Sequence, residues 1–215
     1  MSFEGTVIDS THPNYPVALR DKNAQSLFAR VWAIGNLALL ERPLIGFFCS
    51  VKCPGELILR TYDLARALRD TGVPVISGFH SPIEKDCFDL LLKGSQPIIF
   101  CPARSIQNMR FRKSLKANIE KGRTLVLSPF EGKVRRPTAQ ISERRNHFVG
   151  ALAATVFVSY TEPGGKTEEF CKEILQIGKL LYTFESLHNK PIIDIGAKPV
   201  TTKTITQWTD SLKRE

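Results

Sequence analysis

Six short apolar segments, separated by longer amphipathic ones, are the feature that most constrains the fold of this chain. They are mostly bounded by proline, glycine or serine, and they cover residues 44–49, 73–77, 97–101, 124–128, 155–159 and 180–184. Continuous apolar runs of this length are typical of parallel strands that are buried on both faces. The segments between them place apolar residues on one helical face, which predicts helices at 55–70, 83–93, 105–121, 139–153 and 167–177. This alternation predicts an α/β fold with a doubly wound, mostly parallel, Rossmann-like sheet and right-handed crossovers.

The length of the chain favours one structural unit, because 215 residues suffice for a single large core. Residues 44–196 form the predicted Rossmann-like core, and residues 1–43 are expected to pack on it as a lead-in. Residues 197–215 are expected to form a short polar tail, flexible apart from an anchor at Trp208.

The cysteines and the apolar content indicate the compartment. Five cysteines are an odd number, mostly within apolar segments, which indicates reduced, buried thiols in a cytoplasmic protein. Cys49 and Cys53 are the only close pair, and nothing nearby completes a zinc site, so we expect no metal. No apolar segment approaches the ~20 residues that span a bilayer. Residues 1–16 lack the basic and apolar regions of a secretory signal. We expect a cytoplasmic protein with no membrane association and no cofactor.

The net charge of +9 is concentrated in one part of the chain. Residues 104–145 contain 12 Lys or Arg and 3 Asp or Glu, so the rest of the chain is neutral. A concentrated basic segment on a neutral body indicates a surface that binds a polyanion. A solvated helix face followed by a charged loop would have the same composition, and charge alone does not separate the two interpretations.

Small, hydroxylic and basic residues follow the predicted strands. Ligands of such sheets lie at the carboxyl ends of the strands, where helix N-termini offer free N–H groups to anions. The candidate phosphate-binding residues at these ends are Ser50, Lys52, Ser77, Gly78, His80, Arg104, Gly164, Gly165, Lys166 and Thr167.

The Gly165-Lys166-Thr167 segment has the end of a phosphate-loop motif but not its beginning. A complete motif, G-x-x-x-x-G-K-[ST], needs a glycine where this chain has Tyr160. This argues against an ATPase. A glycine-rich turn that opens a helix can still bind a phosphate through its backbone amides.

Two adjacent arginines, Arg144 and Arg145, precede Asn146 early in a predicted helix. Positive charge near a helix N-terminus opposes the helix dipole, which favours a bound anion at this place. The planar guanidinium suits phosphate, and Asn146 could contact a base or sugar. The alternative interpretation is a pair of solvated charges.

Several segments together resemble the DprA/Smf family of DNA-processing proteins. They are YPVALRD with WAIGNLALLERPLIGFFCS, then TGVPVISGF, SERRNHFVGALAATVFVSY and IGKLLY. The chain departs from the family pattern where Gly-Ser-Arg is replaced by Cys49-Ser50-Val51, and where Ser81 stands in place of a second arginine.

This resemblance implies a non-catalytic protein that binds single-stranded DNA in DNA processing, recombination or natural transformation. It also implies a homodimer and a RecA-type recombinase as partner. On this interpretation the phosphates are held by Arg144, Arg145, Lys52 and the turns at Ser50, Gly78 and 164–167. A basic track would extend this surface through Arg104, Arg110, Arg112, Lys113 and Lys116, with Lys133, Arg135 and Arg136 at its edge.

A second resemblance, to the Lonely-Guy phosphoribohydrolases, involves residues 142–170. It implies an enzyme that releases a base from a nucleoside monophosphate, with Arg144 binding phosphate and Glu168 or Glu169 as the catalytic carboxylate. The same pocket could instead belong to a sensor that binds a nucleotide without hydrolysing it. The glycine-rich loop of this chain is one residue shorter than the family pattern.

Overall fold

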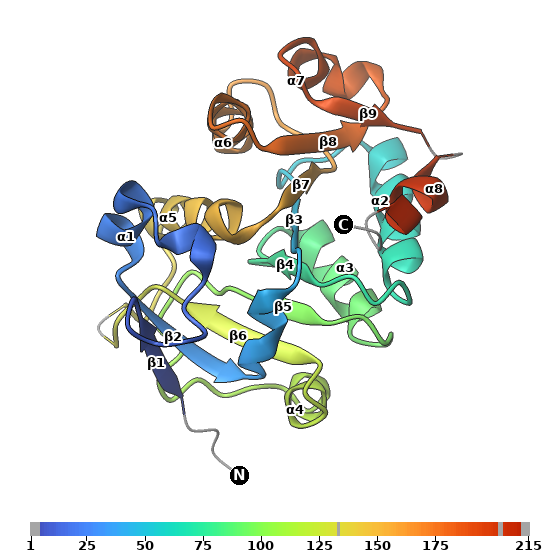
Figure 1. The fold of residues 1–215 in the computed structure, drawn as a ribbon. Coiled ribbons are helices and arrows are strands. Elements are labelled where there is room, and N and C mark those ends of the chain that lie inside the picture. Colours follow the sequence, from blue (N-terminus) through green and yellow to red (C-terminus); the bar gives the residue numbers. More distant parts are fainter. Residues whose placement is uncertain (1–4, 133, 202–203, 212–215) are drawn as a thin grey trace.

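The computed structural model describes residues 5–132, 134–201 and 204–211, and in these the strands form one nine-stranded sheet (Figure 1). The strand order is β1-β2-β6-β5-β4-β3-β7-β8-β9, and every neighbouring pair is parallel except β1–β2 and β2–β6. The predicted fold class is confirmed. The strands are β1 (Thr6–Asp9), β2 (Arg30–Gly35), β3 (Ile45–Phe48), β4 (Val75–Ser77), β5 (Ile98–Phe100), β6 (Thr124–Ser128), β7 (Thr155–Val158), β8 (Leu180–Phe184) and β9 (Lys198–Val200).

The six predicted strands correspond to β3–β8, and most predicted helices lie close to their expected bounds. The α-helices are α1 (Lys22–Phe28), α2 (Gly55–Leu68), α3 (Pro82–Leu91), α4 (Lys113–Glu120), α5 (Ala139–Leu152), α6 (Lys166–Gln176), α7 (Lys190–Asp194) and α8 (Ile205–Ser211). Short 3-10 helices are η1 (Val17–Leu19), η2 (Leu37–Glu41) and η3 (Leu187–Asn189). In the described part of the chain, no helix has both the length and the apolar character needed to cross a membrane.

The prediction of a helix over 105–121 was wrong in its first half. Residues 105–112 form an irregular loop, and α4 begins at Lys113. Asn108 has a φ of 58°, which is incompatible with a right-handed helix. The N–H of Ser105 donates to the carbonyl oxygen of Val134 at 2.7 Å instead of joining a helical ladder.

Each face of the sheet is covered by its own set of helices (Figure 1). One hydrophobic cluster packs under α2, α3, α4 and α8, and the other under α1, α5, α6 and α7. Successive strand residues alternate between the two clusters, with Val75 in the first and Ile76 in the second. Burial on both faces explains why these strands are apolar throughout.

The N-terminal segment contributes strands to the sheet, in addition to packing on it. In β2, Val31 and Ala33 face one hydrophobic cluster while Trp32 and Ile34 face the other. The strand pairs antiparallel with β6, and Trp32 lies opposite Ser128. The core therefore extends into residues that were predicted to be a lead-in.

The described part of the C-terminal segment, residues 197–201 and 204–211, forms a strand and a helix, which departs from the expectation of a flexible tail. Strand β9 pairs with β8, and α8 packs against α2. Trp208 is 8% exposed, and its ring lies 5.1 Å from that of Phe157. Trp208 therefore anchors this segment as predicted.

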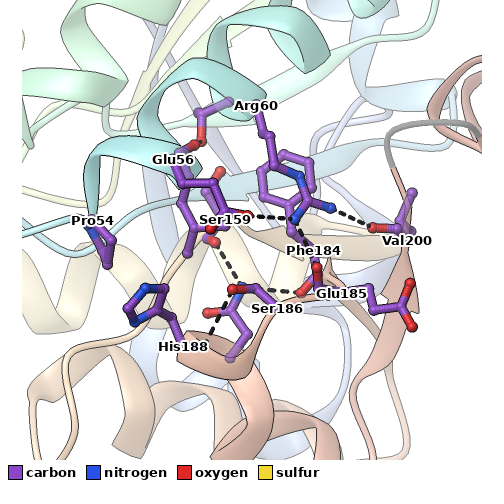
Figure 2. Close-up of polar contacts among 12 residues, drawn as sticks. Pro54, Glu56, Arg60, Ser159, Phe184, Glu185, Ser186, His188 and Val200 are labelled. Atoms are coloured by element: carbon purple, nitrogen blue, oxygen red, sulfur yellow. Dashed lines mark hydrogen bonds and ion pairs between the residues drawn. The ribbon is translucent and has the colours of Figure 1, made fainter.

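Arg60 of α2 connects the helix to the ends of β8 and β9 (Figure 2). Its Nη1 donates to the carbonyl oxygen of Glu185 at 2.7 Å, and its Nη2 donates to that of Val200 at 3.3 Å. The guanidinium lies over the ring of Phe184, 4.7 Å from its centroid, and pairs with Glu56 at 3.4 Å. Arg60 thus holds three elements of this edge in place.

Candidate functional site

The strand order reverses at β3, because β4, β5 and β6 follow on one side of it and β7, β8 and β9 on the other. A crevice at the carboxyl ends of two such strands is the usual ligand site of this architecture. Here the two loops are bonded to each other. The N–H of Ser50 donates to the carbonyl oxygen of Tyr160 at 3.0 Å, and the N–H of Glu162 donates to Ser50 Oγ at 3.0 Å. Lys52 Nζ pairs with Glu162 at 3.2 Å. The crevice is therefore bridged by protein contacts.

The glycine-rich turn before α6 is satisfied by the protein itself. The N–H of Gly164 donates to Glu168 Oε2 at 2.8 Å, and that of Gly165 donates to the carbonyl oxygen of Glu162 at 2.9 Å. Hydrogen bonds from Lys172 and from the Gly164 N–H lower the pKa of Glu168. A carboxylate and a carbonyl oxygen thus accept the hydrogen bonds of two backbone N–H groups that were expected to bind phosphate.

Lys166 and Thr167 open α6, directly after this turn. Lys166 pairs with Glu169 at 2.9 Å and with Glu143 at 3.8 Å, while Thr167 is half-buried. The predicted cation of the turn therefore already has carboxylate partners.

Arg145 lies beneath the surface, which departs from the expectation of a solvent-facing arginine pair. It is 3% exposed, and its Nη1 donates to the carbonyl oxygen of Cys101 at 3.2 Å. Its Nε donates to Asn146 Oδ1 at 2.9 Å, so the Asn146 side chain helps to orient it. A Cβ added to Gly78 would lie 0.8 Å from Nη1, which shows that the guanidinium packs directly on this glycine.

Glu84 is the buried carboxylate that accompanies Arg145. It accepts hydrogen bonds from the N–H groups of Cys49 at 2.8 Å, His80 at 2.6 Å and Ser81 at 3.3 Å. Burial raises the pKa of Glu84, and the nearby positive charge of Arg145 opposes this rise. Together, Arg145 and Glu84 connect α5 with the carboxyl ends of β3, β4 and β5.

Arg144 leaves α5 in a different direction and has different contacts from Arg145. Its Nη2 donates to the carbonyl oxygen of Leu27 at 2.7 Å, and its guanidinium lies 5.8 Å from the centroid of Phe130. Because α5 begins at Ala139, both arginines lie beyond the first turn. The argument from the helix dipole was therefore wrong, since that effect is confined to the first turn.

Ser77 and Gly78 are buried at the end of β4, and His80 is exposed. Ser77 Oγ accepts a hydrogen bond from the N–H of Phe79 at 3.1 Å, so this serine stabilises the turn. His80 is partly shielded because it lines a hollow, and this partial burial, followed by the charges of Arg145 and Lys85, lowers its pKa.

His80 lines a hollow of about 350 Å³ between the N-terminal halves of α5 and α6. Three carboxylates, Glu143, Glu169 and Glu173, line the same hollow, and His147 Nε2 lies 2.8 Å from Glu173. Lys166 lines the same hollow and pairs with Glu143 and Glu169, but the three carboxylates outnumber it, so the charge of the lining disfavours a phosphate chain. Arg144 lines a different hollow of about 400 Å³, so the structure does not bring Arg144 and Glu169 together.

A third hollow, of about 840 Å³, lies between the loops that follow β5 and β6. We call it the arginine hollow; its lining residues are Arg104, Ser105, Gln107, Asn108, Glu131, Gly132 and Arg135. Arg104 was predicted as a site residue and Arg135 as part of the edge. Gln107 and Asn108 were missed because they fall in the segment predicted as helix, and nothing in the local pattern indicates the loop.

The rest of the predicted basic track lies next to this hollow in sequence. Arg110, Arg112, Lys113 and Arg136 are exposed, and Lys116 is half-buried. Arg112 pairs with Asp89 and lies over the ring of Phe88. Lys133 lies outside the described residues.

Comparisons with known proteins identify the family of this sequence and solved structures that share its fold. The family model of DNA recombination-mediator protein A matches residues 6–192. The chain is similar to DNA processing protein A from Streptococcus pneumoniae, with 18% identity, a TM-score of 0.77 and coverage of 97% of this chain and 74% of that one. It is similar to DNA processing protein A from Helicobacter pylori, a protein with a described single-stranded-DNA-binding mode, with 17% identity, a TM-score of 0.75 and coverage of 99% and 97%.

A more distant likeness is to the molybdenum cofactor carrier protein from Chlamydomonas reinhardtii. The identity is 10%, the TM-score is 0.55, and the match covers 81% of this chain and 100% of that one. No curated protein matches the sequence. At these identities, the likeness to solved structures shows a shared fold.

Proposed function

Because the chain belongs to the DNA recombination-mediator protein A family, we propose that it binds single-stranded DNA in DNA processing and recombination, without catalysing a reaction. The match over residues 6–192 is the observation that carries this proposal. A protein of the same fold, from Helicobacter pylori, binds single-stranded DNA. The concentration of positive charge in residues 104–145 supports a polyanion as the ligand.

The positions of the predicted catalytic residues do not favour the enzymatic alternative. Arg144 contacts Leu27 and Phe130, whereas Glu169 pairs with Lys166 in the separate hollow between α5 and α6 that His80 lines. Glu168 pairs with Lys172 at 2.6 Å and accepts the Gly164 N–H. A phosphoribohydrolase would need its phosphate-binding arginine and its catalytic carboxylate around the same substrate molecule.

We expect the affinity for a labelled single-stranded oligonucleotide to fall steeply as salt is raised. Each phosphate contact releases counterions, so the logarithm of the binding constant should fall with the logarithm of salt, by roughly 0.7 per contact for single strands. Fluorescence anisotropy at several salt concentrations measures this slope. Absence of binding at low salt, or affinity that does not change with salt, would contradict the proposed function.

The proposal extends to a homodimer in the cytoplasm that assists a RecA-type recombinase, in recombination or natural transformation. Analytical ultracentrifugation is expected to give twice the mass of the 24.1 kDa chain. Adding the protein to recombinase and coated single-stranded DNA is expected to accelerate filament formation. A monomer at all accessible concentrations would overturn the dimer, and an unchanged filament rate would overturn the recombinase partnership.

A further inference from the structure

The arginine hollow lies at the carboxyl ends of two neighbouring parallel strands, β5 and β6. Two arginines, two carboxamides and one serine line it, together with the carboxylate of Glu131. This lining differs from that of the acidic hollow beside α6, which has three glutamates. Of the two, the arginine hollow is the one whose charge suits a phosphate.

Hydrogen bonds fix the positions of the two loops that form the hollow. Ser128 Oγ donates to the carbonyl oxygen of Arg104 at 2.7 Å, and the N–H of Ser105 donates to the carbonyl oxygen of Val134 at 2.7 Å. The N–H of Gln107 donates to Ser105 Oγ at 3.2 Å. The first two bonds join the segment after β5 to the end of β6 and its loop, and the third lies within the loop after β5. Together they position the lining residues before any ligand arrives.

The polar groups of the hollow are available to a ligand. Within the part of the chain that the structure describes, neither Arg104 nor Arg135 forms an ion pair. Arg104 Nε makes one long bond, 3.4 Å, to the carbonyl oxygen of Ser105. By contrast, Lys52 and Lys166 at the neighbouring strand ends are paired with carboxylates, and Arg145 is buried.

The side chains of Gln107 and Asn108 are exposed, and their carboxamides have no hydrogen-bond partner among the described residues. Asn108 adopts a φ of 58°, a left-handed conformation that costs free energy for a residue other than glycine. Asparagine tolerates this conformation better than most residues and commonly adopts it in turns. The exposed carboxamide of Asn108 therefore projects from a turn of the loop after β5.

We propose that the arginine hollow binds one nucleotide unit of single-stranded DNA, with its phosphate on Arg104 and Arg135 and its base edge on Gln107 and Asn108. Planar guanidinium groups match the geometry of phosphate oxygens. Carboxamides offer both a donor and an acceptor to the exposed edge of an unpaired base. This inference rests on the proposed function and places the strand nearer to β5 and β6 than to the bridged crevice beside β3.

The phosphate contacts are tested with the double variant Arg104→Ala/Arg135→Ala. The matched control is Lys93→Ala/Lys121→Ala. It removes two exposed charges just after α3 and α4, which lie towards the amino ends of β5 and β6 and away from the hollow. We expect the hollow variant to bind single-stranded DNA at least about tenfold more weakly, with a salt slope reduced by roughly 1.4 for two lost contacts. The control is expected to keep most of the affinity, and thermal melting confirms that both variants are folded.

The base contacts are tested with Gln107→Ala/Asn108→Gly, since glycine keeps the left-handed turn without the carboxamide. Wild-type protein is expected to prefer an ordinary oligonucleotide over an abasic one of equal length, and this variant is expected to lose most of that preference. An unchanged preference would overturn the base contact.

Three outcomes separate this inference from the proposed function. If the wild-type protein binds no single-stranded DNA, the proposed function fails, and the inference fails with it. If it binds DNA but the hollow variant and the control variant lose the same affinity, only the assignment of the DNA site to the arginine hollow is wrong. If deoxynucleoside monophosphate competes at concentrations similar to those of the oligonucleotide, the hollow is a site for free nucleotides and the assignment to a DNA strand is overturned.

Discussion

Replacing Arg145 with alanine is expected to lower the free energy of unfolding by about 2–5 kcal/mol, the range typical of truncating a large buried side chain. The guanidinium is 3% exposed, bonds the carbonyl oxygen of Cys101 and fills the space above Gly78. Its removal leaves a cavity and takes away the positive charge that Glu84 faces. Urea denaturation of both proteins measures the difference.

The pH dependence of this loss identifies its cause. Burial already raises the pKa of Glu84 above its ordinary value of 4.5, and without Arg145 the pKa rises further. A carboxyl group with a raised pKa in the folded state stabilises the fold below the unfolded pKa, and this contribution is lost as pH rises through the folded pKa. The deficit of Arg145→Ala should therefore be smallest below about pH 4.5 and grow above it.

The adjacent arginine provides the control for this prediction. Arg144 is exposed and bonds one carbonyl oxygen, so Arg144→Ala should cost about 1 kcal/mol, with little change across pH. If both alanine variants lose similar stability, or if the deficit of Arg145→Ala does not change with pH, then Arg145 has no buried electrostatic role.

Gly78→Ala is expected to destabilise the fold by about 3 kcal/mol or more, because a methyl group and the Arg145 guanidinium cannot occupy the same space. The added Cβ would lie 0.8 Å from Nη1 and 1.8 Å from Cζ. The guanidinium would have to leave its place beside the carbonyl oxygen of Cys101. Thermal melting followed by circular dichroism should show a large drop in the midpoint.

Gly55→Ala is the matched control, because a Cβ at Gly55 meets no atom within 4 Å and the residue lies at the start of α2. Alanine favours helix there, so this variant should be as stable as the wild type or slightly more stable. In an Arg145→Ala background, the additional effect of Gly78→Ala should largely disappear, since the clash is removed. Additive effects in the double variant would contradict the proposed contact.

The sequence predicted the parallel part of the sheet because those strands are buried on both faces. Segments such as 155–159 are apolar throughout, and this property can be recognised without a partner strand. The edge strands were harder to predict. Strand β9 has three residues, two of them exposed, and becomes a strand only by pairing with β8. The loop at 105–112 kept enough helical periodicity to suggest a longer α4, while its contact with Val134 was not visible locally.

The candidate site was predictable in its location but not in which of its charges are free. Ser50, Lys52, Gly78, Arg104 and Lys166 all follow strands, as the architecture requires. Whether each one can bind a ligand depends on its neighbours in space. Lys52 pairs with Glu162, which is 110 residues away in the chain, whereas Arg104 has no such partner among the described residues.

The amino-acid sequence by itself determined the succession of the strands β3–β8 and of the helices between them, the end of these strands where the candidate loops lie, and the resemblance to the DNA-processing family. These depend on apolar periodicity and on short motifs, which are local properties of the chain. Only the tertiary structure decided that Arg145 is buried against Gly78, that the glycine-rich turn is occupied by Glu168, and that an open arginine hollow lies beside β5 and β6. The physical reason is that burial and charge pairing depend on groups far apart in sequence, which meet only when the sheet forms.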